Sequence, residues 1–210
     1  MSLTAPATPA PTMPTAVITA PAHASHEVDN RATYISFGLA YVLGHGSAAL
    51  SRGENGAAVL DLPGWLPMTL LGAGLAVGTV LATRAALRAQ RDATGPEAVT
   101  GQLLGAAWVT AFVALFLVIT GLGATVDHPD IQTLLWPTGS GFVVGLLYVA
   151  EGAARRNRLH YTLGTWLALT STAALLLGNP AFYWVLTIAG GGAYAVAAVL
   201  ERRRLAAIPG

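Results

Sequence analysis

The fold of this chain is decided by residues 103–124, which read LLGAAWVTAFVALFLVITGLGA. This stretch has no charged residue, and as a helix it would span about 33 Å, slightly more than the hydrocarbon core of a bilayer. It is apolar on all sides, which is typical of a helix surrounded by lipid and other helices. A membrane β-strand would instead alternate polar and apolar residues over about 10 positions. The stretch therefore predicts a transmembrane helix.

Five further segments share this length and composition, so the sequence predicts an all-α, polytopic membrane protein with six transmembrane helices. The predicted helices run over Thr33–Ser51, Trp65–Leu87, Leu103–Ala124, Thr133–Ala154, His160–Leu177 and Pro180–Leu200. Each even-numbered helix carries a Trp near its start, then a triplet of small residues, then an Arg cluster. This pattern suggests three helical hairpins. Triplication of a two-helix unit would explain it, and so would the ordinary placement of Trp at helix ends.

The composition agrees with a membrane location. Of the 210 residues, 54% are hydrophobic and 10% are charged, whereas a soluble domain carries about 25% charged residues. The net charge is +1, which leaves no basic footprint for nucleic acid. All 11 basic residues are Arg, which suggests a GC-rich bacterial genome. The absence of Cys excludes disulfides, thiolate metal sites and Cys nucleophiles.

The arginines orient the predicted helices in the membrane. If the helices alternate in direction, ten of the 11 arginines fall on one side and only Arg52 falls on the other. Basic loops are retained in the cytoplasm, so this split predicts a multi-pass protein of the cell membrane with both termini inside. We expect residues 1–30, rich in Pro, Ala and Thr, to be a disordered cytoplasmic tail. Residues 31–205 would form the transmembrane domain, and residues 206–210 a short C-terminal tail.

Two polar residues within the predicted helices are candidate functional groups. His45 is ionisable, and ionisable residues inside a membrane are candidates for a functional role. We expect His45 to play a structural role by hydrogen-bonding a neighbouring helix, with transport or proton relay as the alternative. Ser140 lies between glycines on the fourth helix, where rhomboid intramembrane proteases place a nucleophile. Their mechanism needs a His on the sixth helix, and Pro180–Leu200 has none. The sequence therefore predicts no catalytic residue, no cofactor or metal site, and no enzymatic activity.

Five glycines are candidates for close helix packing, because small residues let helices approach each other where lipid gives no hydrophobic drive. A spacing of four places Gly74 with Gly78, and Gly141 with Gly145, on one helix face. Gly191 belongs to the small-residue triplet of the last helix. We expect Gly74, Gly141 and Gly191 to bring helices two, four and six together near one axis. A dimer face or a substrate channel is the alternative to packing within one bundle.

Two glutamates lie at the cytoplasmic ends of predicted helices. Glu151 precedes Arg155 by four residues, which is the favourable order for a helical ion pair. We expect Glu151 and Glu201 to be interfacial charges rather than ligands of an ion.

Residues 37–46 (FGLAYVLGHG) and 135–141 (LWPTGSG) resemble segments of short six-helix actinobacterial membrane proteins of the ABC transporter permease-like kind. The resemblance covers most of the chain after Arg31 and implies a permease-like or transport-associated subunit. The chain has no ATP-binding signature, so a permease would need a separate ATPase subunit. The alternative function is a non-transporting membrane protein that binds or regulates a partner. The expected partners are the lipid bilayer and either an ATPase subunit or a second copy, with no nucleic acid.

Overall fold

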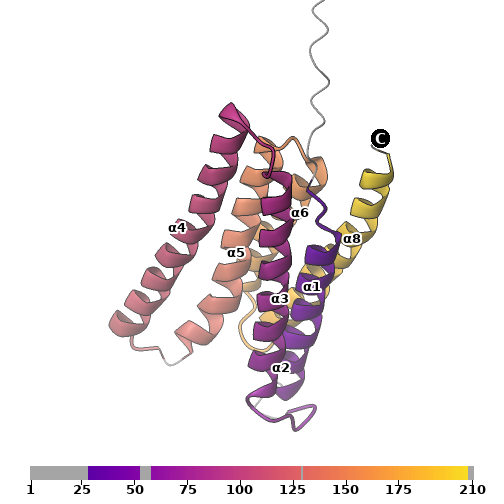
Figure 1. Ribbon diagram of the computed structural model, residues 1–210. Coiled ribbons are helices and arrows are strands. Elements are labelled where there is room, and N and C mark those ends of the chain that lie inside the picture. The colour runs from indigo at the N-terminus through magenta and orange to yellow at the C-terminus, as the bar shows by residue number, and fades with distance from the viewer. Residues whose placement is uncertain (1–27, 53–57, 129, 208–210) are drawn as a thin grey trace, which may run out of the picture.

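The structure is a computed structural model that describes residues 28–52, 58–128 and 130–207 (Figure 1). Within these ranges the chain forms six helices and no strand, which confirms the predicted all-α fold. Four of these helices are long and apolar enough to cross a membrane, as expected of a membrane protein. Most of the tail predicted for residues 1–30, and the end of the one predicted for 206–210, lie outside the described residues.

The first and last helices each contain a π-helical turn. The first helix comprises α1 (Arg31–Ala40), the π turn η1 (Tyr41–His45) and α2 (Gly46–Ser51). The last helix comprises α7 (Ala181–Val185), the π turn η3 (Leu186–Gly190) and α8 (Gly191–Ala206). The four helices between them are α3 (Leu66–Ala89), α4 (Gly95–Thr125), α5 (Ile131–Ala154) and α6 (Arg158–Ala174).

Local sequence signals set several of the helix ends. Pro67 and Pro96 occupy the first turns of α3 and α4, where the N–H that proline lacks would have no partner within the helix. Asn157 caps α6, because its side chain accepts a hydrogen bond from the backbone N–H of His160 at 3.1 Å. Gly178 has a φ of 67°, a left-handed conformation that favours glycine in the turn before α7.

The tightest helix pair is α5–α6, while α1 packs against both α3 and α8 (Figure 1). The helices of each predicted hairpin are also in contact, namely α1 with α3, α4 with α5, and α6 with the last helix, and the α5–α6 contact joins the second hairpin to the third. Glycines explain the closeness of the pair. A Cβ on Gly145 would lie 2.7 Å from the carbonyl oxygen of Gly164, and a Cβ on Gly164 would lie 2.6 Å from that of Gly145. The two backbones therefore touch directly.

Helices α3, α5 and α8 do not pack extensively against one another in the described part of the chain. The expectation that they meet near one axis was wrong, because their glycines face other helices. A Cβ on Gly74 would lie 2.6 Å from Ala40 Cβ on α1. The other four glycines face, in turn, Phe37 on α1 for Gly78, Ser171 on α6 for Gly141, Ala168 on α6 for Gly145, and Val42 on η1 for Gly191.

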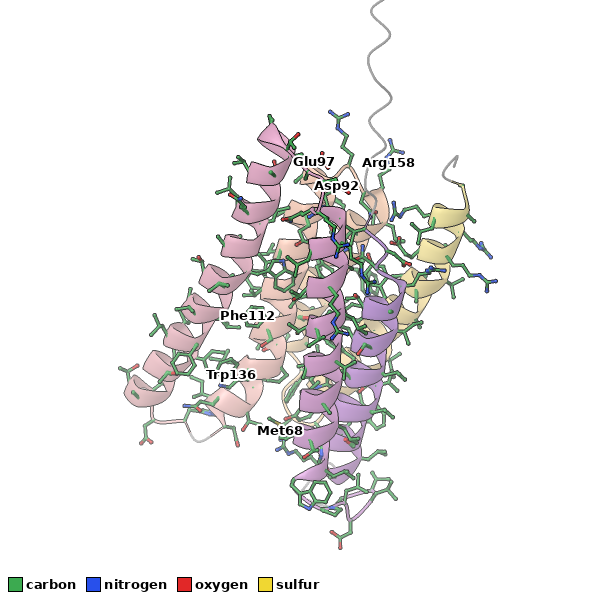
Figure 2. The ribbon with its side chains drawn as sticks, in the orientation of Figure 1. Met68, Asp92, Glu97, Phe112, Trp136 and Arg158 are labelled. Carbon is green, nitrogen blue, oxygen red and sulfur yellow. The ribbon has the colours of Figure 1, made fainter. Side chains whose placement is uncertain are left out.

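The helices alternate in direction, so the described arginines gather at one end of the bundle. The starts of α1, α4 and α6 and the ends of α3, α5 and α8 lie at this end, which we call the arginine-rich end (Figure 1). Arg158 is seen there in Figure 2, whereas Met68 and Trp136 lie toward the opposite, arginine-poor end. Arg52, which follows α2, is the only described arginine at the arginine-poor end.

Helix α4 lies at the flank of the bundle and packs mainly against α5 (Figure 1). Its large apolar side chains are mostly exposed, among them Leu103, Val109, Val113, Phe116, Leu117 and Val118. An apolar helix with so little protein contact is suited to a lipid environment. The buried core lies instead among α1, α5, α6 and the last helix, and it is rich in tyrosine.

Candidate functional site

A carboxylate and an imidazole face each other beside the turn between α5 and α6. Glu151 Oε2 lies 3.1 Å from His160 Nε2, and the two side chains are 22% and 6% exposed. Glu151 lies three residues before the end of α5 and His160 two residues after the start of α6, so the antiparallel helices bring them to nearly the same level. Gly152 permits the close approach, because a Cβ there would lie 2.7 Å from the Cα of Tyr161.

Two further helices complete a chain of hydrogen bonds around this pair. The hydroxyl of Tyr34, on α1, lies 2.6 Å from His160 Nδ1. Trp108, on α4, donates its indole N–H to Glu151 Oε1 at 2.7 Å. We call Trp108, Glu151, His160 and Tyr34 the Glu–His network. Side chains from four helices therefore meet in one hydrogen-bonded group near the arginine-rich end.

Within the Glu–His network, His160 and Glu151 can each take up and release a proton, whereas the indole of Trp108 only donates a hydrogen bond. A neutral imidazole donates from one nitrogen and accepts at the other, so it can link the hydroxyl of Tyr34 to the carboxylate of Glu151. The nearby groups that influence this link electrostatically or through ring contact are Arg155, Glu201, Arg204 and Tyr148.

Three buried tyrosines extend from the Glu–His network toward the arginine-poor end. The ring of Tyr148 lies 4.1 Å from that of His160 and 6.4 Å from that of Tyr194. The ring of Tyr194 lies 5.4 Å from that of Tyr41, which in turn meets His45 edge-on at 4.9 Å. We call Tyr148, Tyr194 and Tyr41 the tyrosine column. The column joins the Glu–His network to His45 through the protein core.

His45 lies in the half of the bundle nearer the arginine-poor end. It is 3% exposed, and its ring lies 6.1 Å from that of Tyr183 on α7. Arg52 donates a hydrogen bond to the hydroxyl of Tyr183, and its guanidinium carbon lies 5.2 Å from the centre of that ring. None of the described residues forms a hydrogen bond with the ring of His45, so the hydrogen bond expected between His45 and a neighbouring helix is not formed with them.

Ser140, the other polar candidate, lies away from these groups. It is partly exposed on α5 and forms no side-chain hydrogen bond with any described residue. The described residues also hold no cluster of three His, Asp or Glu side chains of the kind that binds a metal ion.

The two glutamates predicted to be interfacial charges lie near the arginine-rich end, and both are bound by protein groups. The prediction that Glu151 pairs with Arg155 missed its hydrogen bonds to His160 and Trp108. Hydropathy alone could not reveal these bonds. The short turn between the fifth and sixth predicted helices offered a signal, because residues equally distant from such a turn lie side by side.

Glu201 is fully buried and ties the two ends of the described chain together. It forms an ion pair with Arg204 at 2.7 Å and accepts a hydrogen bond from the backbone N–H of Asn30 at 3.1 Å. Arg204 also donates to the carbonyl oxygen of Val28 at 3.1 Å. The carboxylate is therefore satisfied by α8 and by the residues just before α1, which accounts for its burial.

No protein-family model matches the chain, and neither does any curated protein or solved structure with which it was compared.

Proposed function

We propose that this membrane protein is a permease-like or transport-associated protein that moves protons, alone or together with a solute. The observation that supports this proposal best is the Glu–His network, in which Glu151 and His160 are hydrogen-bonded to each other inside the bundle. A simple lipid anchor needs no ionisable group in its core. Such groups are costly within a membrane, and where they occur they commonly serve proton and ion pathways.

The arrangement of the buried polar and aromatic side chains along the length of the bundle also supports transport. The Glu–His network lies near the arginine-rich end, and the tyrosine column leads from it toward His45 and Tyr183. We infer that the arginine-rich end is cytoplasmic, so that both termini lie inside the cell. A proton entering from outside would then travel along this line and leave near Glu151. We propose no enzymatic activity and no bound cofactor.

Proton flux into liposomes tests the function directly. The purified protein is reconstituted into potassium-loaded vesicles that contain a pH-sensitive dye, and valinomycin then sets an interior-negative potential. We expect the vesicles with protein to acidify faster than empty vesicles. Glu151→Gln keeps the size of the side chain but removes its ionisable group, so acidification should fall to the level of empty vesicles.

Glu97→Gln provides the matched control, because Glu97 is exposed in the first turn of α4, away from the Glu–His network. This variant should conduct protons like the unmodified protein. Equal acidification of empty and protein-containing vesicles would contradict proton transport. Flux that persists in Glu151→Gln, while that variant elutes as a single folded species, would remove Glu151 from the pathway.

A second candidate function is that of a membrane protein that binds a partner, and helix α4 favours it. This 31-residue helix packs mainly against α5 and leaves an apolar face open to lipid or to another helix. A photo-crosslinking residue at Val109 tests this function in cells. Crosslinks to an ATPase subunit or to a second copy would support it, and adducts to lipid alone would contradict it.

A further inference from the structure

The two π turns face each other within the bundle. Turn η1 belongs to the first helix and η3 to the last, and the two are in contact. Glycine makes this contact possible, because a Cβ on Gly190 would lie 2.7 Å from the ring of Tyr41 and one on Gly191 would lie 2.6 Å from Val42. A π turn bonds residue i to i+5 in place of i+4, and such turns are frequent at functional sites.

Two buried polar side chains beside the π turns are not satisfied by the described protein. Ser171 on α6 is fully buried, and its hydroxyl has no hydrogen-bond partner in the described chain. The ring of His45, which is 3% exposed, also forms no hydrogen bond with a described residue, but the Ser171 hydroxyl is the fully buried side-chain atom that lacks a partner in the described chain. Buried polar groups are normally paired with protein or with ordered water. These two groups therefore point to a small hydrogen-bonding ligand.

The hydroxyls of Ser171 and Tyr41 approach the same point. A Cβ on Gly141 would lie 3.2 Å from the hydroxyl oxygen of Tyr41 and would collide with the hydroxyl of Ser171. The ring of Tyr41 in turn meets that of His45 edge-on. Ser171, Tyr41 and His45 thus form one polar cluster, contributed by α6 and η1.

Tyr183 separates this cluster from the arginine-poor end. Its ring lies beside His45, and its hydroxyl is held by Arg52. The titratable or charged groups that face His45 directly or through Tyr183 are Tyr41, Tyr183, Arg52 and Asp130. The Tyr183 ring, held by Arg52, therefore covers His45 on the side that faces this end.

We propose that Ser171, Tyr41 and His45 form a water-binding station on the proton pathway, with the Arg52–Tyr183 contact as its gate. This inference rests on the proposed function. A hydronium ion entering from the arginine-poor end gives its proton to an imidazole nitrogen of His45. One O–H bond breaks, one N–H bond forms and a water molecule remains. The other ring nitrogen can then release a proton to a second water molecule at the station, which becomes hydronium, and the ring returns to its neutral form.

Cysteine labelling tests the station without any measurement of proton flux. The chain has no Cys, so each introduced thiol is the only one present. We place Ser171→Cys, which nearly preserves the size of the side chain, in lipid nanodiscs that leave both ends of the protein open to solution. The probe is a negatively charged methanethiosulfonate, which reacts with thiols in contact with water, and the product is read by intact mass. Leu169→Cys is the matched control, because it lies on the same helix and is 66% exposed toward lipid.

We expect Ser171→Cys to react faster than Leu169→Cys. Adding Tyr183→Phe, which removes the hydroxyl that Arg52 holds but keeps the ring, should raise the rate at Ser171→Cys by about tenfold, the order expected when a hydrogen bond to a charged group is lost. The rate at Leu169→Cys should not change. His45→Cys serves as a second probe of the station if Ser171→Cys does not insert.

Equal labelling of Ser171→Cys and Leu169→Cys in both backgrounds would overturn the station. Faster labelling at Ser171→Cys that Tyr183→Phe leaves unchanged would overturn the gate. These outcomes do not depend on Glu151. If Glu151→Gln conducts protons normally while Ser171→Cys still reacts as expected, the proposed pathway through Glu151 fails and the water-binding station stands.

Discussion

A single methyl group added at Gly145 should weaken the tightest helix contact in the protein. In Gly145→Ala the new Cβ would lie 2.7 Å from the carbonyl oxygen of Gly164 and 2.8 Å from Ala168 Cα, and it would collide with Ala168 N. All three are backbone atoms, so no rotamer change relieves the overlap. Overpacking of this kind costs up to about 3 kcal/mol. The higher helix propensity of Ala offsets about 1 kcal/mol of that cost.

The net loss of about 2 kcal/mol should lower the thermal midpoint by about 4–8 °C in a chain of this length. The midpoint is read in detergent as the fraction of protein that remains monodisperse on size exclusion after heating. Gly105→Ala is the control, because a Cβ there meets nothing within 4 Å. It should leave the midpoint unchanged or raise it slightly. A Gly145→Ala protein that melts with the unmodified chain would refute the close contact between α5 and α6.

Three further predictions concern packing, orientation and surface charge. Gly141→Leu should lower the thermal midpoint in detergent, because the new side chain would enter the space of the Ser171 hydroxyl. Val113→Leu, on the exposed face of α4, should leave the midpoint unchanged. Equal midpoints for the two variants would contradict the packing of Gly141 against α6. Reporter fusions after Arg158 should read cytoplasmic and those near Asp127 external, and an external signal at Arg158 would refute the orientation. Asp29→Asn should lower the free energy of unfolding by less than about 1 kcal/mol, because the ion pair between Asp29 and Arg31 is half exposed. The hydrogen bond from Arg31 lowers the pKa of Asp29, so this small contribution is present at neutral pH and is lost as acid titration passes below the ordinary Asp pKa of about 4. If the thermal midpoint of Asp29→Asn depends on pH in the same way as that of the unmodified protein, the Asp29–Arg31 pair does not contribute this stability.

Hydropathy predicted where the helices lie but not always where they end. The segment expected over Leu103–Ala124 is the helix Gly95–Thr125 in the structure. Its extra first turns contain Pro96 and Glu97, which suit a helix start but carry no hydrophobic signal. Helical hydrogen bonding continues beyond the apolar stretch, so a method that detects apolar length alone begins the helix too late.

The π turns could not be predicted from local sequence. Residues 41–45 and 186–190 have compositions that an ordinary α-helix also accepts. What distinguishes them is their mutual contact, which depends on Gly190 and Gly191 facing Tyr41 and Val42 from the other end of the chain. His45 was therefore recognisable as an unusual residue, whereas its unpaired ring and its tyrosine neighbours depend on the tertiary structure.

Two devices hold the bundle together, close backbone contact at glycines and hydrogen bonds between buried polar side chains, and both occur where α5 meets α6. Lipid gives helices no hydrophobic reason to associate, so close backbone contact and polar pairs must supply specificity. Glycines close α5 onto α6 and α1 onto α3, whereas α4 has a polar tie to the bundle through the bond from Trp108 to Glu151. The residue proposed to carry a proton is thus also one that anchors the most exposed helix. Loss of the negative charge at Glu151 would weaken the bond from Trp108, because a neutral carboxyl is a poorer acceptor than a carboxylate. In the proposed transport function, proton uptake at Glu151 would loosen the attachment of α4 and so link proton movement to a change in helix packing.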